Sequence, residues 1–165
     1  MAVEIERKFL VQSDAWRDGV SRTLRLRQAY VGGGDRCSVR VRISDTEAWL
    51  GLKGRVRGAS RLEFEYGIPV DDSDVIFEHL CSGDRIEKLR HIVPWQGHEW
   101  EVDEFRGPNQ GLVLAEIELD SENETFVAPP WLGHEVTLDV RYYNSQLARN
   151  PWPQWVDASL AGVPA

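Results

Sequence analysis

The N-terminal residues Glu4, Glu6 and Lys8 combine two carboxylates and one ammonium group at two-residue spacing. Alternate residues of a β-strand point to the same face of the sheet. If this segment is a strand, both acids and the base therefore share one face. Carboxylate oxygens bind hard metal ions and ammonium groups bind anions, so the triplet is suited to holding a metal and an anionic ligand together.

The same alternation of charged and apolar residues recurs in short segments separated by Gly, Asp, Asn and Pro. It predicts strands at residues 3–11, 23–31, 37–44, 48–53, 61–68, 86–93, 98–105, 112–119 and 135–140, with a glycine turn at 32–35. Helices are expected to be few and short, between residues 71 and 83 and at 144–149. Short strands at this spacing favour an antiparallel sheet or barrel.

The charged positions of these segments are sorted by sign. Basic segments carry Arg25, Arg27, Arg40, Arg42, Lys53, Lys88 and Arg90, and acidic ones carry Glu99, Glu101, Asp103, Glu116 and Glu118. One interpretation is a sandwich with a solvated charged face. The other is a closed barrel whose lumen holds a basic wall and an acidic wall. Unpaired buried ions cost several kcal/mol each, so such a lumen would need a polyanion and a cation to compensate its charges.

The residue types narrow the choice of ligands. Arginine presents a planar fork of donors that matches phosphate oxygens, so an arginine-rich wall favours a phosphate chain. Paired carboxylates without neighbouring His or Cys ligands favour Mg²⁺ or Mn²⁺ over zinc. The residues alone therefore predict a metal-dependent site for a phosphate chain.

Composition excludes several other classes. A chain of 165 residues predicts one domain, and its net charge of -8 argues against a general nucleic-acid binder. We find no apolar run of the length that a signal peptide or a membrane span requires. Cys37 and Cys81 have no CxxC spacing and are expected to be free thiols. We expect a cytoplasmic protein that binds neither nucleic acid nor membrane and is a monomer or a homodimer.

The triplet Glu4-x-Glu6-x-Lys8 resembles the ExExK signature of the triphosphate tunnel metalloenzymes, also called CYTH domain proteins. Further segments follow in the order of that family, at residues 39–42, 52–54, 63–65, 88–90, 103, 115–118, 135–137 and 143–144. The resemblance implies a mainly β fold, an eight-stranded antiparallel β-barrel that forms a tunnel with a charged interior, flanked by a few short helices. It places the domain at residues 1–151 and leaves 152–165 as an irregular C-terminal extension.

The resemblance also implies roles inside the tunnel. Phosphate oxygens would be bound by Lys8, Arg40, Arg42, Lys53, Lys88 and Arg90. The metal, Mg²⁺ or Mn²⁺, would be ligated by Glu4, Glu6, Glu116 and Glu118. A second metal or the attacking water would be held by Glu63, Glu65 and Asp103. Arg25 and Arg27 match the family less closely and are either supporting charges or surface residues.

Lys53 is the candidate catalytic residue, because it could orient or deprotonate the attacking water, with Tyr30 as a candidate assistant. Neighbouring arginines would lower the pKa of Lys53 and neighbouring carboxylates would raise it, so the sequence leaves the direction open. Gly51 stands where family members often have Thr, and a glycine permits a bulge that would shift Lys53.

The favoured function is hydrolysis of inorganic triphosphate to pyrophosphate and phosphate. A class IV-like adenylate cyclase has the same ExExK barrel, and a thiamine or nucleoside triphosphatase would need the same phosphate contacts. The alternative outside enzymology is a polyphosphate-binding module. Products formed from tripolyphosphate, ATP and thiamine triphosphate would distinguish these four.

Overall fold

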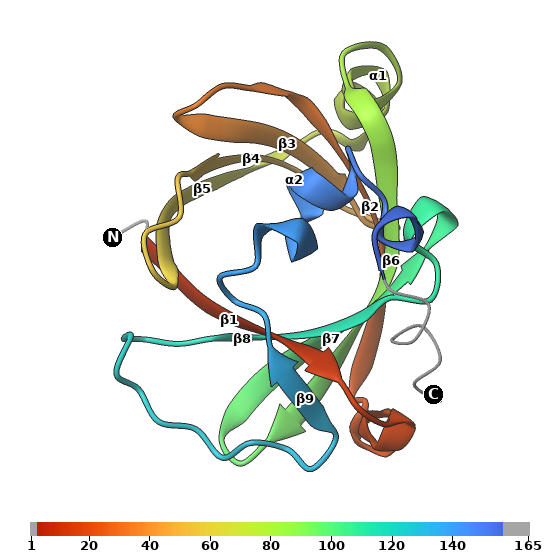
Figure 1. The fold of residues 1–165 in the computed structure, drawn as a ribbon. Coiled ribbons are helices and arrows are strands. Elements are labelled where there is room, and N and C mark those ends of the chain that lie inside the picture. The colour runs from red at the N-terminus through yellow and green to blue at the C-terminus, as the bar shows by residue number, and fades with distance from the viewer. Residues whose placement is uncertain (1–2, 157–165) are drawn as a thin grey trace.

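The computed structural model describes residues 3–156, whose strands form one antiparallel, closed wall (Figure 1). The strands are β1 Val3–Val11, β2 Arg22–Gly33, β3 Cys37–Ile43, β4 Ala48–Gly54, β5 Ser60–Ile68, β6 Ser82–Trp95, β7 His98–Arg106, β8 Val113–Glu118 and β9 Leu132–Glu135. Their order in the sheet is β5-β4-β3-β2-β6-β7-β8-β1-β9, and an additional pairing of β5 with β1 closes β1–β8 into a ring. The predicted eight-stranded barrel is therefore confirmed.

Strand β1 closes the ring because its two halves have different partners. Its first residues pair with β5, with Glu4 opposite Arg61. From Glu6 onward it pairs with β8, with Glu6 opposite Glu118 and Lys8 opposite Glu116. Residues directly opposite each other in an antiparallel pair point to the same side of the sheet. The ExExK triplet consequently lies on the inner face, at the seam of the barrel.

One apolar cluster lies outside the wall, between the strands and the segments that cover them. Phe9, Trp100 and Ile117 alternate with inner charged residues and pack with Trp131 and with Trp16, which belongs to the 3₁₀ turn Asp14–Gly19. Trp16 and Trp100 are almost fully buried. Burial of such large rings contributes roughly 25 cal/mol per Å² of apolar surface, so this cluster is a major source of the barrel's stability.

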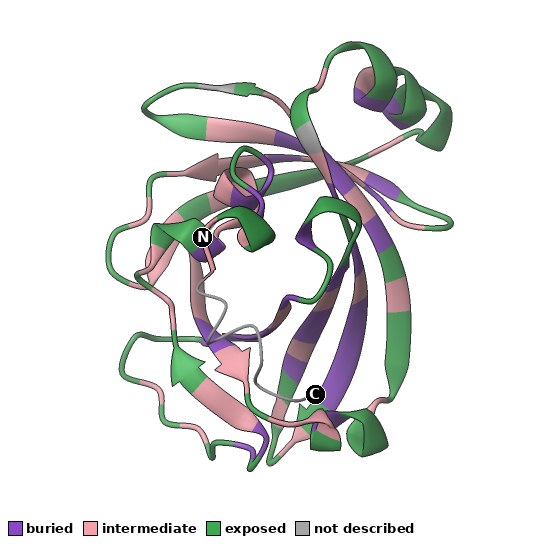
Figure 2. Cartoon of the chain, turned by 45° about the vertical axis from the view of Figure 1, so that its right-hand side comes forward, coloured by how far each residue is buried: buried purple, intermediate pink, exposed green. Residues whose placement is uncertain are grey.

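Two helices pack against the ring. Helix α1, Val70–His79, packs Phe77 on the outer faces of β2 and β3 and leaves its other side exposed (Figure 2). Helix α2, Asn144–Leu147, lies across the barrel opening (Figure 1). Its Leu147 packs with Ile86, Phe105 and Leu114 in a second apolar cluster. Two more 3₁₀ turns, Gly107–Asn109 and Val140–Tyr142, border this cluster.

Several predicted boundaries differ from the structure. The strand predicted at 135–140 is wrong: β9 ends at Glu135, and Asp139 accepts a hydrogen bond from the backbone N–H of Arg141, which starts a 3₁₀ turn. The glycine turn lies two residues later than predicted, because β2 continues through Gly33 across a register shift. Helix α2 ends at Leu147, two residues before its predicted end.

The beginning of the C-terminal extension belongs to the packed domain. Trp152 starts the 3₁₀ turn Trp152–Gln154, and its backbone N–H donates to Asn109 Oδ1 over 2.8 Å. The ring of Trp155 meets that of Tyr142 edge to face, with centroids 5.2 Å apart. The remainder of the predicted extension, 157–165, lies outside the described residues. In the described part of the chain, both cysteines are free and no helix is long and apolar enough to cross a bilayer.

Candidate active site

Charged side chains from most strands of the ring converge on a cavity of about 400 Å³ inside the barrel, here called the lumen cavity. Its lining is almost entirely charged: Val3, Glu4, Glu6, Arg40, Arg42, Lys53, Arg61, Glu63, Glu65, Arg90, Glu101, Glu116, Glu118 and Asn144. A solvated outer face would scatter these charges around the molecule. The closed ring instead directs them toward one another, so the solvated-face interpretation is wrong.

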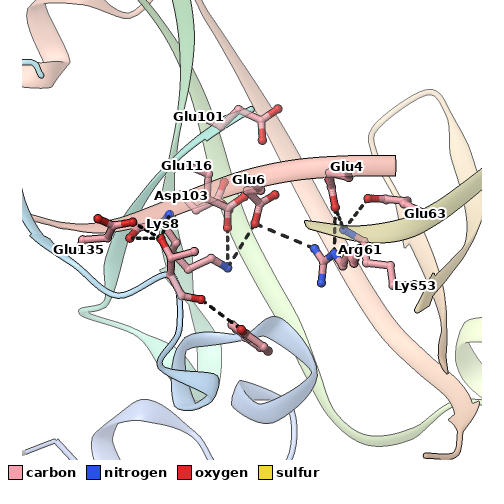
Figure 3. Close-up of polar contacts among 12 residues, drawn as sticks. Glu4, Glu6, Lys8, Lys53, Arg61, Glu63, Glu101, Asp103, Glu116 and Glu135 are labelled. Atoms are coloured by element: carbon pink, nitrogen blue, oxygen red, sulfur yellow. Dashed lines mark hydrogen bonds and ion pairs between the residues drawn. The ribbon is translucent and has the colours of Figure 1, made fainter. Parts of the chain in front are cut away.

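Lys8 of β1 contacts carboxylates of its own strand and of the neighbouring strand β8. Its Nζ lies 2.9 Å from Glu116 Oε1 and 3.8 Å from Glu6 Oε1 (Figure 3). Burial alone would lower the pKa of Lys8, but the charges of Glu116 and Glu6 outweigh it and raise that pKa. Burial also opposes the charged form of Glu116, yet Lys8 and Arg90 hold its pKa well below the usual range. Lys8 and Glu116 are therefore both charged at neutral pH.

A second network connects β1 with β4 and β5. Lys53 Nζ lies 3.0 Å from Glu63 Oε2 and 3.4 Å from Glu4 Oε2. Arg61 Nε donates to the same Glu4 oxygen over 2.9 Å, as Figure 3 shows. Burial, reinforced by Arg40 and Arg61, lowers the pKa of Lys53. The structure thus resolves the direction that the sequence left open.

Gly51 leaves the sheet regular and Lys53 in place. It is opposite Arg40 on one side and Glu65 on the other, without a register shift. A Cβ at this position would lie 3.7 Å from the Arg40 guanidinium, an ordinary contact distance. Arg40 passes over the glycine to reach Glu65 Oε2 over 3.1 Å. A methyl group at position 51 would therefore contact the guanidinium without blocking its path to Glu65.

Asp103 is enclosed by cations. Its carboxylate accepts hydrogen bonds from Lys88 Nζ over 2.5 Å and from Arg90 Nε over 2.8 Å, and it is fully buried. Burial favours the neutral acid, but Arg90 and Lys88 hold the pKa of Asp103 below its usual value. Burial lowers the pKa of Lys88 to about 8. Neither Asp103 nor Lys88 lines the lumen cavity, whereas Arg90 does and also pairs with Glu116 and Glu101.

The acidic residues at the seam repel one another. Burial and the charge of Glu116 raise the pKa of Glu6. Burial, Glu4 and Glu6 raise the pKa of Glu118, which faces Glu6 across the β1–β8 pair. Clustered carboxylates with raised pKa values are a donor set that a divalent cation would stabilise. Within residues 3–156, however, no three acidic, histidine or cysteine side chains converge in the arrangement of a metal site.

A smaller cavity of about 50 Å³ adjoins the lumen cavity beneath α2. We call it the α2 pocket; Tyr30, Tyr143 and Ser145 line it together with Lys8, Arg40, Lys53 and Arg61. Burial raises the pKa of Tyr30, although Arg40 and Arg61 oppose this effect. Its phenol is consequently a hydrogen-bond donor at neutral pH. Tyr30 and Lys53 both line the α2 pocket.

The structure sorts the sequence-predicted residues into inner and outer ones. Arg25 and Arg27 point outward, since their register partners in β6 are Leu89 and Glu87. Arg27 lies 3.5 Å from Asp74 of α1. The inner-face positions of β2 hold Leu24, Leu26, Gln28 and Tyr30, whose partners in β3 or β6 face the lumen.

Three polar residues of the lumen cavity were not predicted as site residues. Arg61 lines both the lumen cavity and the α2 pocket, and its place before Glu63 in an alternating segment was the signal available. Glu101 alternates with Asp103 and lines the lumen cavity. Asn144 lines both cavities, and its buried Oδ1 has no hydrogen-bond partner among the described residues.

Comparison with known proteins shows how widely this architecture is shared. The model of the CYTH domain family matches residues 2–147. The inorganic triphosphatase of Acetivibrio thermocellus is 48% identical over 152 residues, which cover 92% of this chain and 97% of that protein. The inorganic triphosphatase of Nitrosomonas europaea is 39% identical over 150 residues, covering 88% and 96%. A crystal structure of an inorganic triphosphatase aligns with a TM-score of 0.66 at 37% identity, covering 90% of this chain and 95% of that one.

Proposed function

Because the chain belongs to the CYTH domain family, we propose that it is an inorganic triphosphatase that splits tripolyphosphate into pyrophosphate and phosphate inside its barrel. The observation that carries this proposal is the lumen cavity, whose lining is charged apart from Val3 and Asn144. A chain of phosphates can bind the cations of this lining directly and its carboxylates through a divalent ion. An adenine group would be placed against ionised side chains, at the cost of their desolvation.

Four cations share the α2 pocket and would hold the phosphate chain there: Lys8, Arg40, Lys53 and Arg61. Arg42 and Arg90 line the wider lumen cavity and would bind the rest of the chain. Lys88 was predicted as a phosphate ligand, but it bonds Asp103 at the edge of this network. We propose that Lys88 and Asp103 orient Arg90 rather than contact the substrate.

The metal would be held by the carboxylates of β1 and β8, which are Glu4, Glu6, Glu116 and Glu118. Their oxygen donors and mutual repulsion suit Mg²⁺ or Mn²⁺. When bound, such an ion would shield the negative phosphate oxygens and lower the pKa of a coordinated water. Glu63 and Glu65 lie on β5, which pairs with the start of β1, and would position a second ion or the water.

Lys53 would remove the proton of the attacking water. Its lowered pKa increases the neutral fraction of the amine, and its side chain lines both cavities. The water oxygen then bonds to the terminal phosphorus as the P–O–P bridge breaks. Its proton goes to Lys53 Nζ, and the bridging oxygen leaves with the bond electrons as part of pyrophosphate. Tyr30, protonated because it is buried, would donate a hydrogen bond to a phosphate oxygen.

The test is the release of phosphate and pyrophosphate from tripolyphosphate, ATP and thiamine triphosphate, each with Mg²⁺ or Mn²⁺. Preferred turnover of tripolyphosphate to one pyrophosphate and one phosphate is the expected result. Cyclic AMP from ATP would instead identify an adenylate cyclase. Metal-dependent binding without turnover would identify a polyphosphate-binding module. The cytoplasmic location, the lack of nucleic-acid and membrane partners and the choice between monomer and homodimer stay predictions.

A further inference from the structure

Arg61 occupies the carboxylates that the proposed metal would need. Its Nε donates to Glu4 Oε2 over 2.9 Å, and its Nη2 lies 4.0 Å from Glu6 Oε1. The pairing of β5 with β1 places Arg61 directly opposite Glu4, so closure of the barrel brings the two together. Burial would lower the pKa of Arg61, but the charges of Glu6 and Glu4 raise it.

The Glu4 oxygen is already saturated in this arrangement. Glu4 Oε2 accepts from Arg61 Nε and also lies 3.4 Å from Lys53 Nζ. A carboxylate oxygen that accepts two charged donors has little lone-pair capacity left for a third ligand. A divalent cation that binds Glu4 through Oε2 must therefore displace at least one of these donors.

Arg61 has room to be displaced, because it borders three cavities. Besides the lumen cavity and the α2 pocket, it lines a cavity of about 710 Å³ between the β2–β3 and β4–β5 hairpins. Its movement toward the α2 pocket would bring the guanidinium next to Arg40 and Lys53, where the phosphate chain is proposed to bind. Charge balance favours this movement. The bound metal ion would replace Arg61 as the counterion of the carboxylates, and the incoming polyanion needs a further cation such as Arg61.

We propose that Arg61 is a displaceable counterion for Glu4 and Glu6, which competes with the divalent cation for these carboxylates and moves to the triphosphate when the cation binds. In the metal-free protein it neutralises the seam. In the loaded protein it is a substrate-positioning residue. The inference rests on the metal site of the proposed function but not on turnover.

The experiment is a calorimetric titration of Mn²⁺ into the metal-free full-length protein without phosphate. Arg61→Gln removes the competitor, and we expect it to bind Mn²⁺ about tenfold more tightly, the value of one charge-assisted hydrogen bond. Arg57→Gln is the matched control: Arg57 is exposed, lines the neighbouring cavity and has no carboxylate partner within residues 3–156. It should leave the affinity unchanged within about twofold, since exposed charges are screened.

Unchanged or weaker Mn²⁺ binding by folded Arg61→Gln would overturn the inference, as would no Mn²⁺ binding by the unmodified protein. If Arg61→Gln does not fold, crystals of the unmodified protein with and without Mn²⁺ decide. Loss of the Arg61–Glu4 bond in the Mn²⁺ crystals supports displacement, and its persistence beside a bound ion refutes it. Tighter Mn²⁺ binding by the variant, combined with no triphosphate hydrolysis by the unmodified protein, would reject the proposed function and keep this inference.

Discussion

Replacement of Lys53 by arginine separates its charge from its ability to accept a proton. Lys53 pairs with Glu63 over 3.0 Å and with Glu4 over 3.4 Å, and an arginine retains the positive charge for both carboxylates. An arginine cannot lose its proton at any working pH. Lys53→Arg therefore removes the proposed proton acceptor while the electrostatic contacts with phosphate remain.

The expected loss follows from the size of general-base catalysis. Proton transfer by a positioned group contributes about 10²–10⁴-fold, so kcat for tripolyphosphate should fall by at least roughly 100-fold in Lys53→Arg. The KM should stay within about threefold, because the lost interaction belongs to the transition state. Lys53→Ala should lose turnover to the same extent and still bind substrate through the other cations of the α2 pocket.

The dependence of the rate on pH gives an independent readout. Burial, Arg40 and Arg61 lower the pKa of Lys53, so the neutral amine accumulates at lower pH than for an ordinary lysine. The kcat of the unmodified protein should rise as pH increases toward the folded-state pKa of Lys53 and then level off. The rise should be missing in Lys53→Arg. Initial rates of phosphate release at saturating Mg²⁺ measure both quantities, and an arginine variant within about threefold of the original kcat would refute the role of Lys53 as a base.

Three further variants test the charge network. Asp103→Asn should lower the free energy of unfolding by about 3–5 kcal/mol in urea denaturation, because it leaves Lys88 buried without its carboxylate and removes one of the carboxylates that pair with Arg90. A loss below about 1 kcal/mol would contradict the buried network. The folded-state pKa of Asp103 is lowered, so this stabilisation is present above its unfolded-state pKa and should disappear as pH falls through the folded one. Glu118→Gln should raise the melting temperature of the metal-free protein, because it relieves the repulsion from Glu4 and Glu6. It should also weaken Mn²⁺ binding at least about tenfold, and an unchanged Mn²⁺ affinity would exclude Glu118 as a ligand. Arg25→Gln should leave kcat and KM unchanged, since its register places it outside the barrel, and a loss of activity would show that the register is wrong.

The sequence predicted the inner face of most strands correctly, because charged residues recur there at alternate positions, as at Arg40 and Arg42. Segment 23–31 shows the limit of this reasoning. Alternation separates its residues into two sets, but the strand itself does not say which set faces inward. The register with β6, which places Leu26 opposite Lys88, decides the matter and turns Arg25 outward.

The ion pairs of the lumen could not be predicted from the sequence either. Glu4 meets Lys53 and Arg61 only because the barrel closes between β1 and β5, across 49 and 57 positions of the chain. The same closure decides the direction of the Lys53 pKa shift, since it sets how much burial and how many arginines surround the amine. Residue types therefore predicted the ligand class, whereas partners and pKa shifts required the fold.

The most direct test of the lumen as the triphosphate site is a crystal structure of the protein with a non-hydrolysable tripolyphosphate analogue and Mg²⁺. The analogue should lie inside the barrel, with its phosphate oxygens on Arg40, Lys53 and Lys8 and the ion on the carboxylates of β1 and β8. An analogue bound only on the outer surface, with the ion pairs of the lumen intact, would contradict the proposed site.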